Sequence, residues 1–261
     1  MILIRGAGDI ASGIAVRLYR AGYTPVMTDL SEPTAIRRTV CFSEAILQGS
    51  CTVEGITAEH AETNAEASDI LTRGRIPVFA DDEGTVLSML QPKAVVDARL
   101  AKLNLGTTIT DAPIVIAIGP GFTAGEDCHA VIETQRGHYL GRANYAGAAA
   151  PNTGVPGNIG GYTVERIIRA PKAGVFHPLR AIGDQVSANE TVAYVDYAPV
   201  TCQIGGTLRG ILPEGTRVHQ GMKSGDVDPR CRPEHCLCAS DKALSVGGGV
   251  LEALLHFGYR E

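Results

Sequence analysis

The sequence has no long hydrophobic run and no concentrated run of basic residues. Of its 261 residues, 44% are hydrophobic and 20% are charged, and the formal net charge is −5. A membrane-spanning helix needs about 20 consecutive apolar residues, and a nucleic-acid surface needs a cluster of Lys and Arg. We therefore expect a globular protein that binds neither a membrane nor a nucleic acid.

The N-terminal residues also lack the basic start, apolar core and small-residue cleavage site of a signal peptide. Residues 1–5 lead directly into a strand–glycine–helix pattern. We therefore expect a cytoplasmic protein, whose seven cysteines are kept reduced. The chain length is suited to roughly two domains of about 100–200 residues each.

The first thirty residues predict a βαβ unit. Residues 1–5 form a short apolar run, and apolar residues then recur at helical spacing from Ile10 to Leu18, ending at Gly22. A second strand is predicted over 24–28. Further strands, with a helix near 61–71 before them, are predicted at 76–80, 94–97 and 114–118. Alternating strands and helices predict an α/β fold, here a Rossmann-like parallel sheet covered on both faces.

The turn of this βαβ unit has the pattern Gly6-x-Gly8-x-x-Ala11, and Asp29 lies 21 residues after Gly8. Gly6 permits a tight turn, Gly8 lets a pyrophosphate approach the backbone, and Ala11 allows close helix–strand packing. The helix N-terminus attracts phosphate, and Asp29 would accept hydrogen bonds from a ribose 2′-hydroxyl. The alternative is a turn whose glycines serve packing only.

We therefore predict that NAD or a related nucleotide binds at this turn. The predicted cofactor-binding residues are Gly6, Ala7, Gly8, Asp9, Ile10, Ala11 and Asp29. Asp9 is unfavourable near a pyrophosphate unless its carboxylate turns outward and caps the helix.

A second glycine-rich segment, 119–127, follows the predicted strand 114–118. Ligands bind at the carboxyl ends of parallel strands, and backbone N–H groups in such a loop can surround an anion. We add Gly119, Gly121, Phe122 and Gly125 to the predicted cofactor-binding residues. A plain structural turn is the alternative.

Two polar segments contain candidates for acid–base chemistry or an anion clamp. A hairpin predicted from 130–133 and 139–140 would place Asp127, His129 and Glu133 on one face. Asp97 ends a predicted strand, and Lys102 could pair with a phosphate or with Asp97. The candidate catalytic residues are Asp97, Lys102, His129, Glu133, Arg136 and His138. The alternatives are a solvated hairpin and, for Asp97, a helix cap.

A segment rich in Gly, Pro and Asn, residues 147–161, predicts a domain boundary. Beyond it the sequence is β-rich, and five positions recur 32 residues later: Gly174, Gly183, Val186, Val195 and Asp196 as Gly206, Gly215, Val218, Val227 and Asp228. This spacing predicts a biotinyl/lipoyl-like sandwich, unless it is a coincidence. Residues 197–205 contain no Lys, so a carrier function is not expected.

The predicted domains are a Rossmann-like domain over 1–162, a β-rich domain over 163–235 and a C-terminal docking helix within 236–261. The helix is expected to follow a Gly-rich start at 247–249.

Cys231, His235, Cys236 and Cys238 lie within eight residues. Zinc sites usually have two separated pairs of ligands, so we predict no metal site here. Whether these residues act in redox chemistry stays open.

Long strings along the chain are similar to a known family. They are 6–13, 36–38, 96–98, 119–122, 131–134, 136–138, 152–154, 225–230, 240–243 and 247–249. On these strings the chain resembles the YqeB family of the selenium-dependent molybdenum hydroxylase system. The resemblance implies an accessory, or maturation, factor for a hydroxylase that carries the molybdenum cofactor and labile selenium. It implies no particular reaction and no catalytic residues.

Three functions remain open on the sequence. The first is an accessory factor that binds a nucleotide or the molybdenum cofactor where the glycine loops at Gly6, Gly119 and Gly247 converge. The second is an NAD-dependent oxidoreductase that acts on a small molecule. The third is a non-catalytic protein that docks on the hydroxylase.

Overall fold

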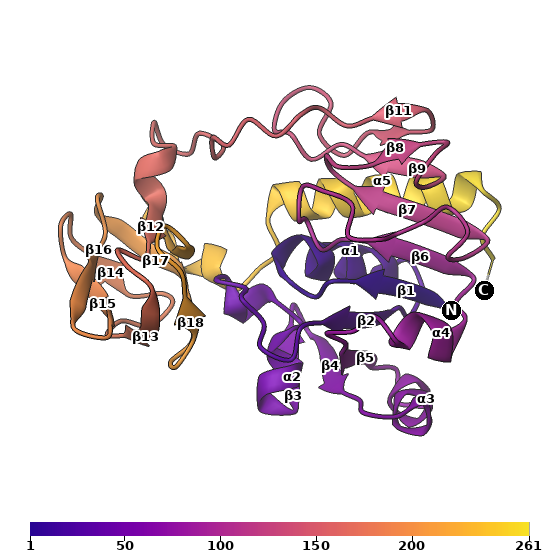
Figure 1. The fold of residues 1–261 in the computed structure, drawn as a ribbon, viewed down its shortest axis with the longest axis horizontal. Coiled ribbons are helices and arrows are strands. Elements are labelled where there is room, and N and C mark those ends of the chain that lie inside the picture. Colours follow the sequence, from indigo (N-terminus) through magenta and orange to yellow (C-terminus); the bar gives the residue numbers. More distant parts are fainter. Residues whose placement is uncertain (261) are drawn as a thin grey trace. The chain divides into compact units, whose positions relative to one another are not determined.

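The computed structural model describes residues 1–260, which fall into two compact units. Unit 1 contains residues 1–33, 41–153 and the segment that begins at Ala239. Unit 2 contains residues 34–40 and 154–238. Figure 1 shows the elements of both units.

Unit 1 is an α/β unit with a nine-stranded, mostly parallel sheet in the order β10-β9-β7-β6-β1-β2-β5-β4-β3. Only the outermost pairs, β10–β9 and β3–β4, are antiparallel. The bounds are β1 (Ile2–Arg5), β2 (Val26–Asp29), β3 (Ser50–Val53), β4 (Ile56–His60), β5 (Ile76–Ala80), β6 (Ala94–Asp97), β7 (Ile114–Ile118), β9 (Ala130–Ile132) and β10 (Ala143–Asn144). A separate pair joins β8 (Thr123–Ala124) to β11 (Gly147–Ala148).

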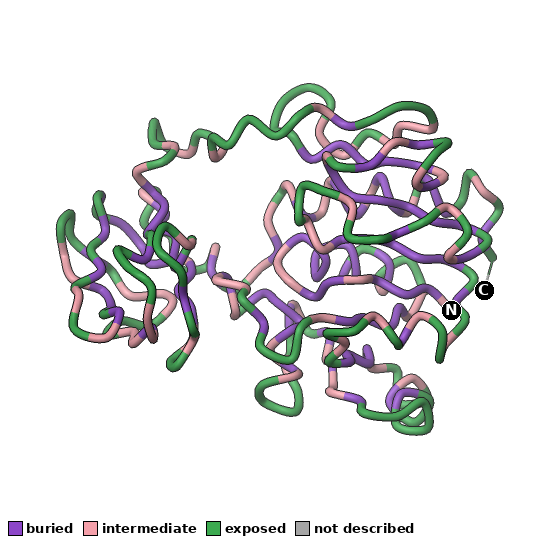
Figure 2. Tube along the Cα trace, in the orientation of Figure 1, coloured by how far each residue is buried: buried purple, intermediate pink, exposed green. Residues whose placement is uncertain are grey.

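The order of the parallel strands reverses beside β1. From β1 the chain proceeds to β2 and later β5 on one side, then returns to add β6, β7 and β9 on the other. The central strands are apolar and buried, as the tube in Figure 2 shows. At such a reversal, the loops that leave neighbouring strands diverge at the carboxyl ends and open a crevice.

Helices α1 (Asp9–Arg20) and α5 (Asp241–His256) pack closely together. A Cβ atom at Gly13 would lie 2.4 Å from Ala243 Cβ, and one at Gly247 would lie 2.9 Å from Arg17 Cβ. The remaining helices of unit 1 are α2 (Glu44–Gln48), α3 (Asn64–Thr72) and α4 (Val86–Leu90). Within residues 1–260, no helix combines the length and the hydropathy needed to cross a membrane.

The prediction of a glycine loop before the C-terminal helix is wrong. The helix begins at Asp241, where the Ser240 side chain accepts a hydrogen bond from the Ala243 N–H. Gly247 and Gly249 therefore lie inside the helix, and a Cβ atom at Gly249 would lie 2.1 Å from Gly141 O. These glycines permit close packing, so no ligand loop exists at Gly247.

Unit 2 contains two four-stranded antiparallel sheets, β12-β19-β17-β14 and β16-β15-β13-β18. Their inner residues form one apolar cluster that includes Phe176, Val195, Leu208 and Val227. The bounds are β12 (Ile167–Arg169), β13 (Gly174–Pro178), β14 (Gln185–Val186), β15 (Thr191–Val195), β16 (Ala198–Thr201), β17 (Gly206–Ile211), β18 (Arg217–Val218) and β19 (Lys223–Asp228).

The strand registers of unit 2 follow the 32-residue spacing of the sequence. The first half contains β13 and β14, and the second half contains β17 and β18. The second strand of each half pairs with the first strand of the other half, as β14 with β17 and β18 with β13. The equivalent pairs are Gly174–Val218 with Gly206–Val186, and Phe176–Val195 with Leu208–Val227. The two halves are therefore related by an internal approximate symmetry.

The unit boundaries differ from those expected. Residues 34–40 belong to unit 2 because Ile36 O accepts the Ile211 N–H at 2.9 Å and Arg38 Nε donates to Ile211 O at 3.2 Å. The boundary near residue 162 moves back to 153/154, since Arg166 bonds to both Gly157 and Asp226. Cys236 and Cys238 lie in unit 2, so the C-terminal segment of unit 1 begins at Ala239.

Candidate functional site

The turn after β1 contains two glycines with different roles. Gly6 has φ +108°, and a Cβ atom there would lie 2.8 Å from Ala98 O, so both conformation and packing require glycine. Gly8 is the N-cap of α1 with φ −73°, and a Cβ atom there would meet nothing within 4 Å. Nothing in the described part of the protein therefore requires a glycine at position 8, and the space beside it is open.

The amides at the start of this turn are bonded within the protein. Gly6 N–H donates to Thr28 O at 2.7 Å, and Ala7 N–H donates to Asp29 Oδ2 at 2.8 Å. The other Asp29 oxygen accepts the Leu30 N–H at 2.9 Å. Burial raises the pKa of Asp29, and these two N–H donors act against that rise. Asp29 is thus placed beside the glycine turn, as predicted, but one of its oxygens holds Ala7.

The next backbone N–H groups of the turn belong to Gly8 and to the first turn of α1, Asp9 to Ala11. The first N–H groups of an α-helix have no acceptor within the helix, and the helix dipole makes this end positive. Ile10 and Ala11 are buried. The Ser12 hydroxyl donates to Ala7 O at 3.0 Å and so fixes the conformation of the turn. Among these residues, Gly8 is the one beside which the space is open.

Asp97, at the end of β6, is buried and is held by three side-chain donors and by the Arg99 backbone N–H. Arg99 Nε and Nη2 lie 3.1 and 2.5 Å from its oxygens, and the Thr107 hydroxyl donates at 2.6 Å. Burial acts to raise the pKa of Asp97, but the hydrogen bonds from Arg99 and Thr107 outweigh it and lower the pKa. The partner of Asp97 is therefore Arg99, and the predicted pairing with Lys102 is wrong; Lys102 is exposed.

The segment 98–103 connects the two glycine turns. It contacts Gly6 through Ala98, and a Cβ atom at Gly121 would lie 2.7 Å from Leu103 N. Gly119 and Gly121 both have positive φ, +78° and +108°. The structure thus brings the turns at Gly6 and Gly119 to one edge of the sheet.

The rest of the Gly119 segment forms an internally bonded turn. Phe122 is buried in the core, and Gly125 N–H donates to Cys128 O at 2.8 Å. A Cβ atom at Gly119 would lie 2.8 Å from Thr134 Oγ1. Close packing accounts for Gly119 and Phe122, and a φ of +92° accounts for Gly125, which favours the structural-turn alternative for this segment.

The predicted acid–base residues around 129–138 do not meet. His129 Nδ1 accepts the Val115 N–H at 3.0 Å, and Glu133 accepts the Gln135 and Ala150 N–H groups at 2.7 and 2.8 Å. Arg136 forms a bidentate ion pair with Asp241. Each side chain has its own local partner, so the described residues form no single constellation.

The hairpin predicted from 130–133 and 139–140 does not form. β9 spans only Ala130–Ile132, lies parallel to β7, and pairs antiparallel with Ala143–Asn144 rather than with 139–140. His138 instead packs edge-to-face against Tyr139, with ring centroids 5.1 Å apart. Period-two reasoning failed here because the strand is too short to place Asp127, His129 and Glu133 on one face.

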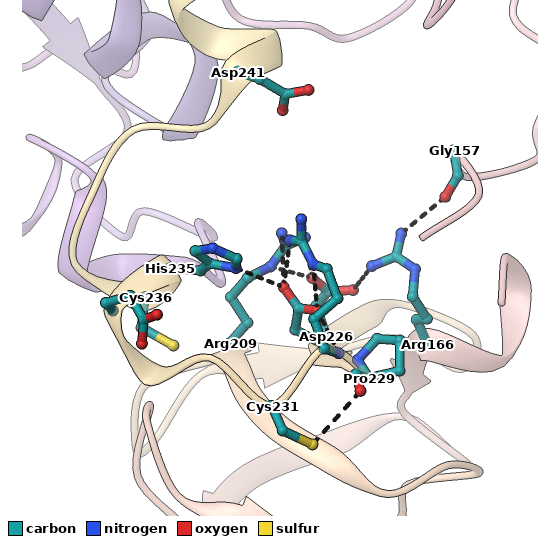
Figure 3. Close-up of polar contacts among 12 residues, drawn as sticks. Gly157, Arg166, Arg209, Asp226, Pro229, Cys231, His235, Cys236 and Asp241 are labelled. Carbon is teal, nitrogen blue, oxygen red and sulfur yellow. Dashed lines mark hydrogen bonds and ion pairs between the residues drawn. The ribbon is translucent and has the colours of Figure 1, made fainter. Parts of the chain in front are cut away.

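Unit 2 contains an ionic cluster that the sequence reasoning missed (Figure 3). Asp226 and Asp228 alternate along β19 and are 2% and 0% exposed. Asp226 accepts from Arg166 Nη1 at 2.7 Å and from Arg209 Nε and Nη2 at 2.9 and 2.5 Å. Asp228 is held by Arg230, whose Nε and Nη2 lie 2.9 and 2.6 Å away.

Two local features build this cluster. Residues i and i+2 of a strand share a face, so Asp226 and Asp228 point the same way. The register of β17 shifts between Leu208 and Gly210, and this bulge turns Arg209 toward both carboxylates. The donors lower the pKa of Asp228 to about 2, although burial acts in the opposite direction.

The cysteines near this cluster differ in access. Cys236 is 2% exposed, and burial raises the pKa of its thiol. Cys231 is exposed, with its thiol 3.5 Å from Pro229 O. All seven cysteines are free thiols.

The fold thus defines a protein class: an α/β unit with a mostly parallel sheet, joined to a unit of two antiparallel sheets. Comparison with known proteins then shows the family. The chain is 51% identical over 255 residues to the uncharacterized protein YqeB of Escherichia coli strain K12, with 98% of this chain and 47% of YqeB covered. The chain is therefore a relative of the YqeB family, as its motifs predicted, and spans about half the length of that curated relative.

No model of a known protein family matches the chain. Among solved structures, an aspartoacylase family protein from Mesorhizobium loti is similar with 14% identity and a TM-score of 0.26, over 59% of this chain and 61% of the other. A succinylglutamate desuccinylase/aspartoacylase from Rhodobacter sphaeroides has 13% identity and a TM-score of 0.24, over 83% and 61%. Scores this low carry no argument about function.

Proposed function

We propose that unit 1 is a Rossmann-like domain that binds an anionic, nucleotide-like ligand at the turn after β1, and that the protein is an accessory factor in the maturation of a molybdenum hydroxylase. The ligand is a nucleotide such as NAD or the molybdenum cofactor, an anionic pterin phosphate. The strand order β5-β2-β1-β6-β7-β9 supports the fold assignment, since it follows the 3-2-1-4-5-6 order of dinucleotide-binding domains.

The observation that carries the ligand proposal is the open space at Gly8. Gly6 is explained by its positive φ and by its contact with Ala98, but Gly8 has neither constraint. A glycine that the protein itself does not need, at the positive end of α1 and beside the strand-order reversal, leaves room for phosphate oxygens to reach backbone N–H groups.

The accessory role rests on the resemblance to the YqeB family. In this role unit 2 docks on the hydroxylase. Its exchanged, symmetrically repeated strands support a biotinyl/lipoyl-like sandwich. Because the turn region Tyr197 to Gly205 has no Lys to carry a group, we assign unit 2 a docking function.

Replacing Gly8 with Ala tests the ligand proposal. The added Cβ atom meets no protein atom within 4 Å, so folding is retained, but the methyl group occupies the space that a phosphate needs. We expect at least tenfold weaker binding of the ligand that the wild type prefers among ATP, NAD and molybdenum cofactor, measured by calorimetry. Equal affinity of the Gly8→Ala variant would remove the phosphate-turn assignment.

Gly248→Ala is the matched control. Gly248 lies in helix α5, and a Cβ atom there also meets nothing within 4 Å. This variant should bind the ligand with wild-type affinity, so that a loss confined to Gly8→Ala reports on the turn itself.

The accessory role has its own test in cells. Hydroxylase purified from cells without this protein should contain less molybdenum cofactor, and wild-type protein but not Gly8→Ala should restore it. An unchanged cofactor content would exclude the maturation role. No specific observation favours NAD-dependent oxidation, because each of the proposed acid–base groups forms hydrogen bonds with a different partner and they do not meet in one site.

A further inference from the structure

One histidine of unit 2 faces a buried carboxylate. His235 Nδ1 is itself buried and lies 3.7 Å from Asp228 Oδ2, while the His235 side chain as a whole is 33% exposed. In Figure 3 a dashed line runs from the labelled His235 ring to an unlabelled carboxylate, and this line is the ion pair with Asp228. His235 therefore has one nitrogen turned inward and part of its ring accessible from outside.

The backbone around His235 is fixed. The short helix η3 (Pro233–Cys236) carries it, with Pro233 at its first turn. Arg37 Nη2 donates to His235 O at 3.0 Å, and the Thr39 hydroxyl donates to Cys236 O at 2.5 Å. These bonds come from a distant segment of the same unit and hold the imidazole against β19.

The carboxylate that faces His235 is surrounded by cationic groups. Arg230 binds Asp228 through two side-chain nitrogens, and Arg209 Nη1 lies 3.6 Å from the same Oδ2 that His235 approaches. Across the cluster, Arg166, Arg209 and Arg230 pair with two carboxylates. Asp228 therefore remains ionised. Glu234 adds a carboxylate beside His235 but pairs with Arg232, and Arg37 adds a guanidinium group at the His235 backbone, so cationic groups outnumber carboxylates near the imidazole.

This arrangement determines which imidazole nitrogen carries the proton. The ring nitrogen that faces a hydrogen-bond acceptor carries the hydrogen. The other nitrogen of the neutral ring then has the lone pair. Because Asp228 faces Nδ1, the neutral His235 ring has its hydrogen on Nδ1. Nε2 is then the proton acceptor.

We propose that Asp228 and His235 form a carboxylate–imidazole pair that takes a proton from an anionic substrate at Nε2. The substrate carries an O–H group together with its negative charge, as in a phosphate monoanion. The O–H bond breaks, its electron pair stays on the substrate oxygen, and the proton forms an N–H bond to Nε2. The resulting imidazolium is stabilised by Asp228, and the proton returns in the reverse step.

The present 3.7 Å separation is an ion-pair distance rather than a hydrogen bond. Hydrogen bonds at acid–base sites are often long before substrate binds and shorten in the complex. A buried imidazole nitrogen without a hydrogen bond is itself unusual, because such groups are normally satisfied. When the distance between His235 Nδ1 and Asp228 Oδ2 shortens to that of a hydrogen bond, this nitrogen gains its partner.

Nitrogen NMR of the full-length protein at alkaline pH, where imidazoles are neutral, tests the pair directly. His235 is expected as the Nδ1–H tautomer. His129 is the internal control: its Nδ1 accepts the Val115 N–H, so its hydrogen must lie on Nε2. If His235 also has its hydrogen on Nε2, the proposal is overturned.

Two further measurements complete the test. Inorganic phosphate should shift the His235 nitrogen signals and leave those of His129 unchanged; no shift at His235 overturns the anionic substrate. Asp228→Asn should convert His235 to the Nε2–H form, and retention of the Nδ1–H form contradicts the positioning role of Asp228. If that variant fails to fold, the wild-type tautomer and the phosphate titration still decide.

The matched control variant for Asp228 is Asp196→Asn. Asp196 occupies the equivalent position 32 residues earlier and pairs with Lys172 at the surface. Its replacement should leave the His235 tautomer unchanged, and a change there would mean that the tautomer does not report on Asp228. This proposal concerns unit 2 alone and does not depend on ligand binding in unit 1.

Discussion

Each unit contains the same local motif at a strand end, an Asp followed two residues later by an Arg that folds back onto it. In unit 1, Arg99 N, Nε and Nη2 bind Asp97. In unit 2, Arg230 N, Nε and Nη2 bind Asp228. Both aspartates are at most 1% exposed as residues, and both carboxylates have a lowered pKa.

The surroundings of the two motifs differ. Asp97 receives its other hydrogen bond from a neutral hydroxyl, Thr107. Asp228 instead belongs to a chain in which carboxylates and guanidinium groups alternate, through Arg209 and Asp226 to Arg166. The local motif sets the conformation at the end of the strand. Residues distant in sequence decide the further partner of the carboxylate, which is a hydroxyl group for Asp97 and a second guanidinium group for Asp228.

The largest effect should follow from breaking the ionic chain of unit 2. Asp226→Ala leaves the guanidinium groups of Arg166 and Arg209 buried without their shared carboxylate. Removing one partner of a buried ion pair costs about 3–5 kcal/mol, and we expect a loss of that size in urea unfolding. Asp196→Ala, at the surface of the same unit, should lose far less; equal losses would contradict the assigned role of burial.

A smaller effect is expected for the neutral donor of unit 1. Thr107→Val keeps the shape of the side chain but removes the hydroxyl that donates to Asp97 and accepts from Arg5 at 2.9 Å. A lost buried hydrogen-bond partner costs about 1–3 kcal/mol. The exposed neighbour Thr110 provides the control, and Thr110→Val should leave the unfolding midpoint nearly unchanged. A loss as large as that of Asp226→Ala would show that the two sites do not differ.

The mildest perturbation is acid. The pKa of Asp228 is lowered to about 2 from 3.8, so its ionised form stabilises the fold fully above the unfolded value and loses this effect as pH falls from 3.8 toward 2. Urea midpoints should fall over this range, and less so in Asp228→Asn.

Asp29 should show the opposite sign. Its pKa is raised by burial, so its contribution is most favourable below the unfolded pKa and is lost as pH rises through the folded value. Asp29→Asn should therefore gain stability relative to wild type as pH rises from the unfolded pKa of Asp29 through its raised folded pKa. A gain that appears instead on acidification would contradict the assigned effect of burial.

The parts of the structure that were predictable rest on local patterns. Apolar runs identified β1, β6 and β7, and the glycines after β1 identified the start of α1. The 32-residue spacing anticipated which strands of unit 2 are equivalent. Each of these signals is contained within a few neighbouring residues or repeats at a fixed distance.

The misses have a common physical cause. The glycines near residue 247 predicted a loop, but their role is to let α1 and α5 approach, which requires knowledge of the partner helix. Asp226 and Asp228 alternate with apolar residues as in a solvent-facing strand edge, and only the positions of Arg166 and Arg209 show that they are buried.

The sequence by itself determined the strands β1, β2, β5, β6 and β7, the helix α1, the glycine turn at Gly6, the repeat of unit 2 and the relation to the YqeB family. The tertiary structure decided which charges meet: Asp97 with Thr107, Asp226 with Arg166 and Asp228 with His235. Backbone conformation depends on near neighbours and is written locally in the chain. Burial and ionic pairing depend on segments that come together only when the chain folds.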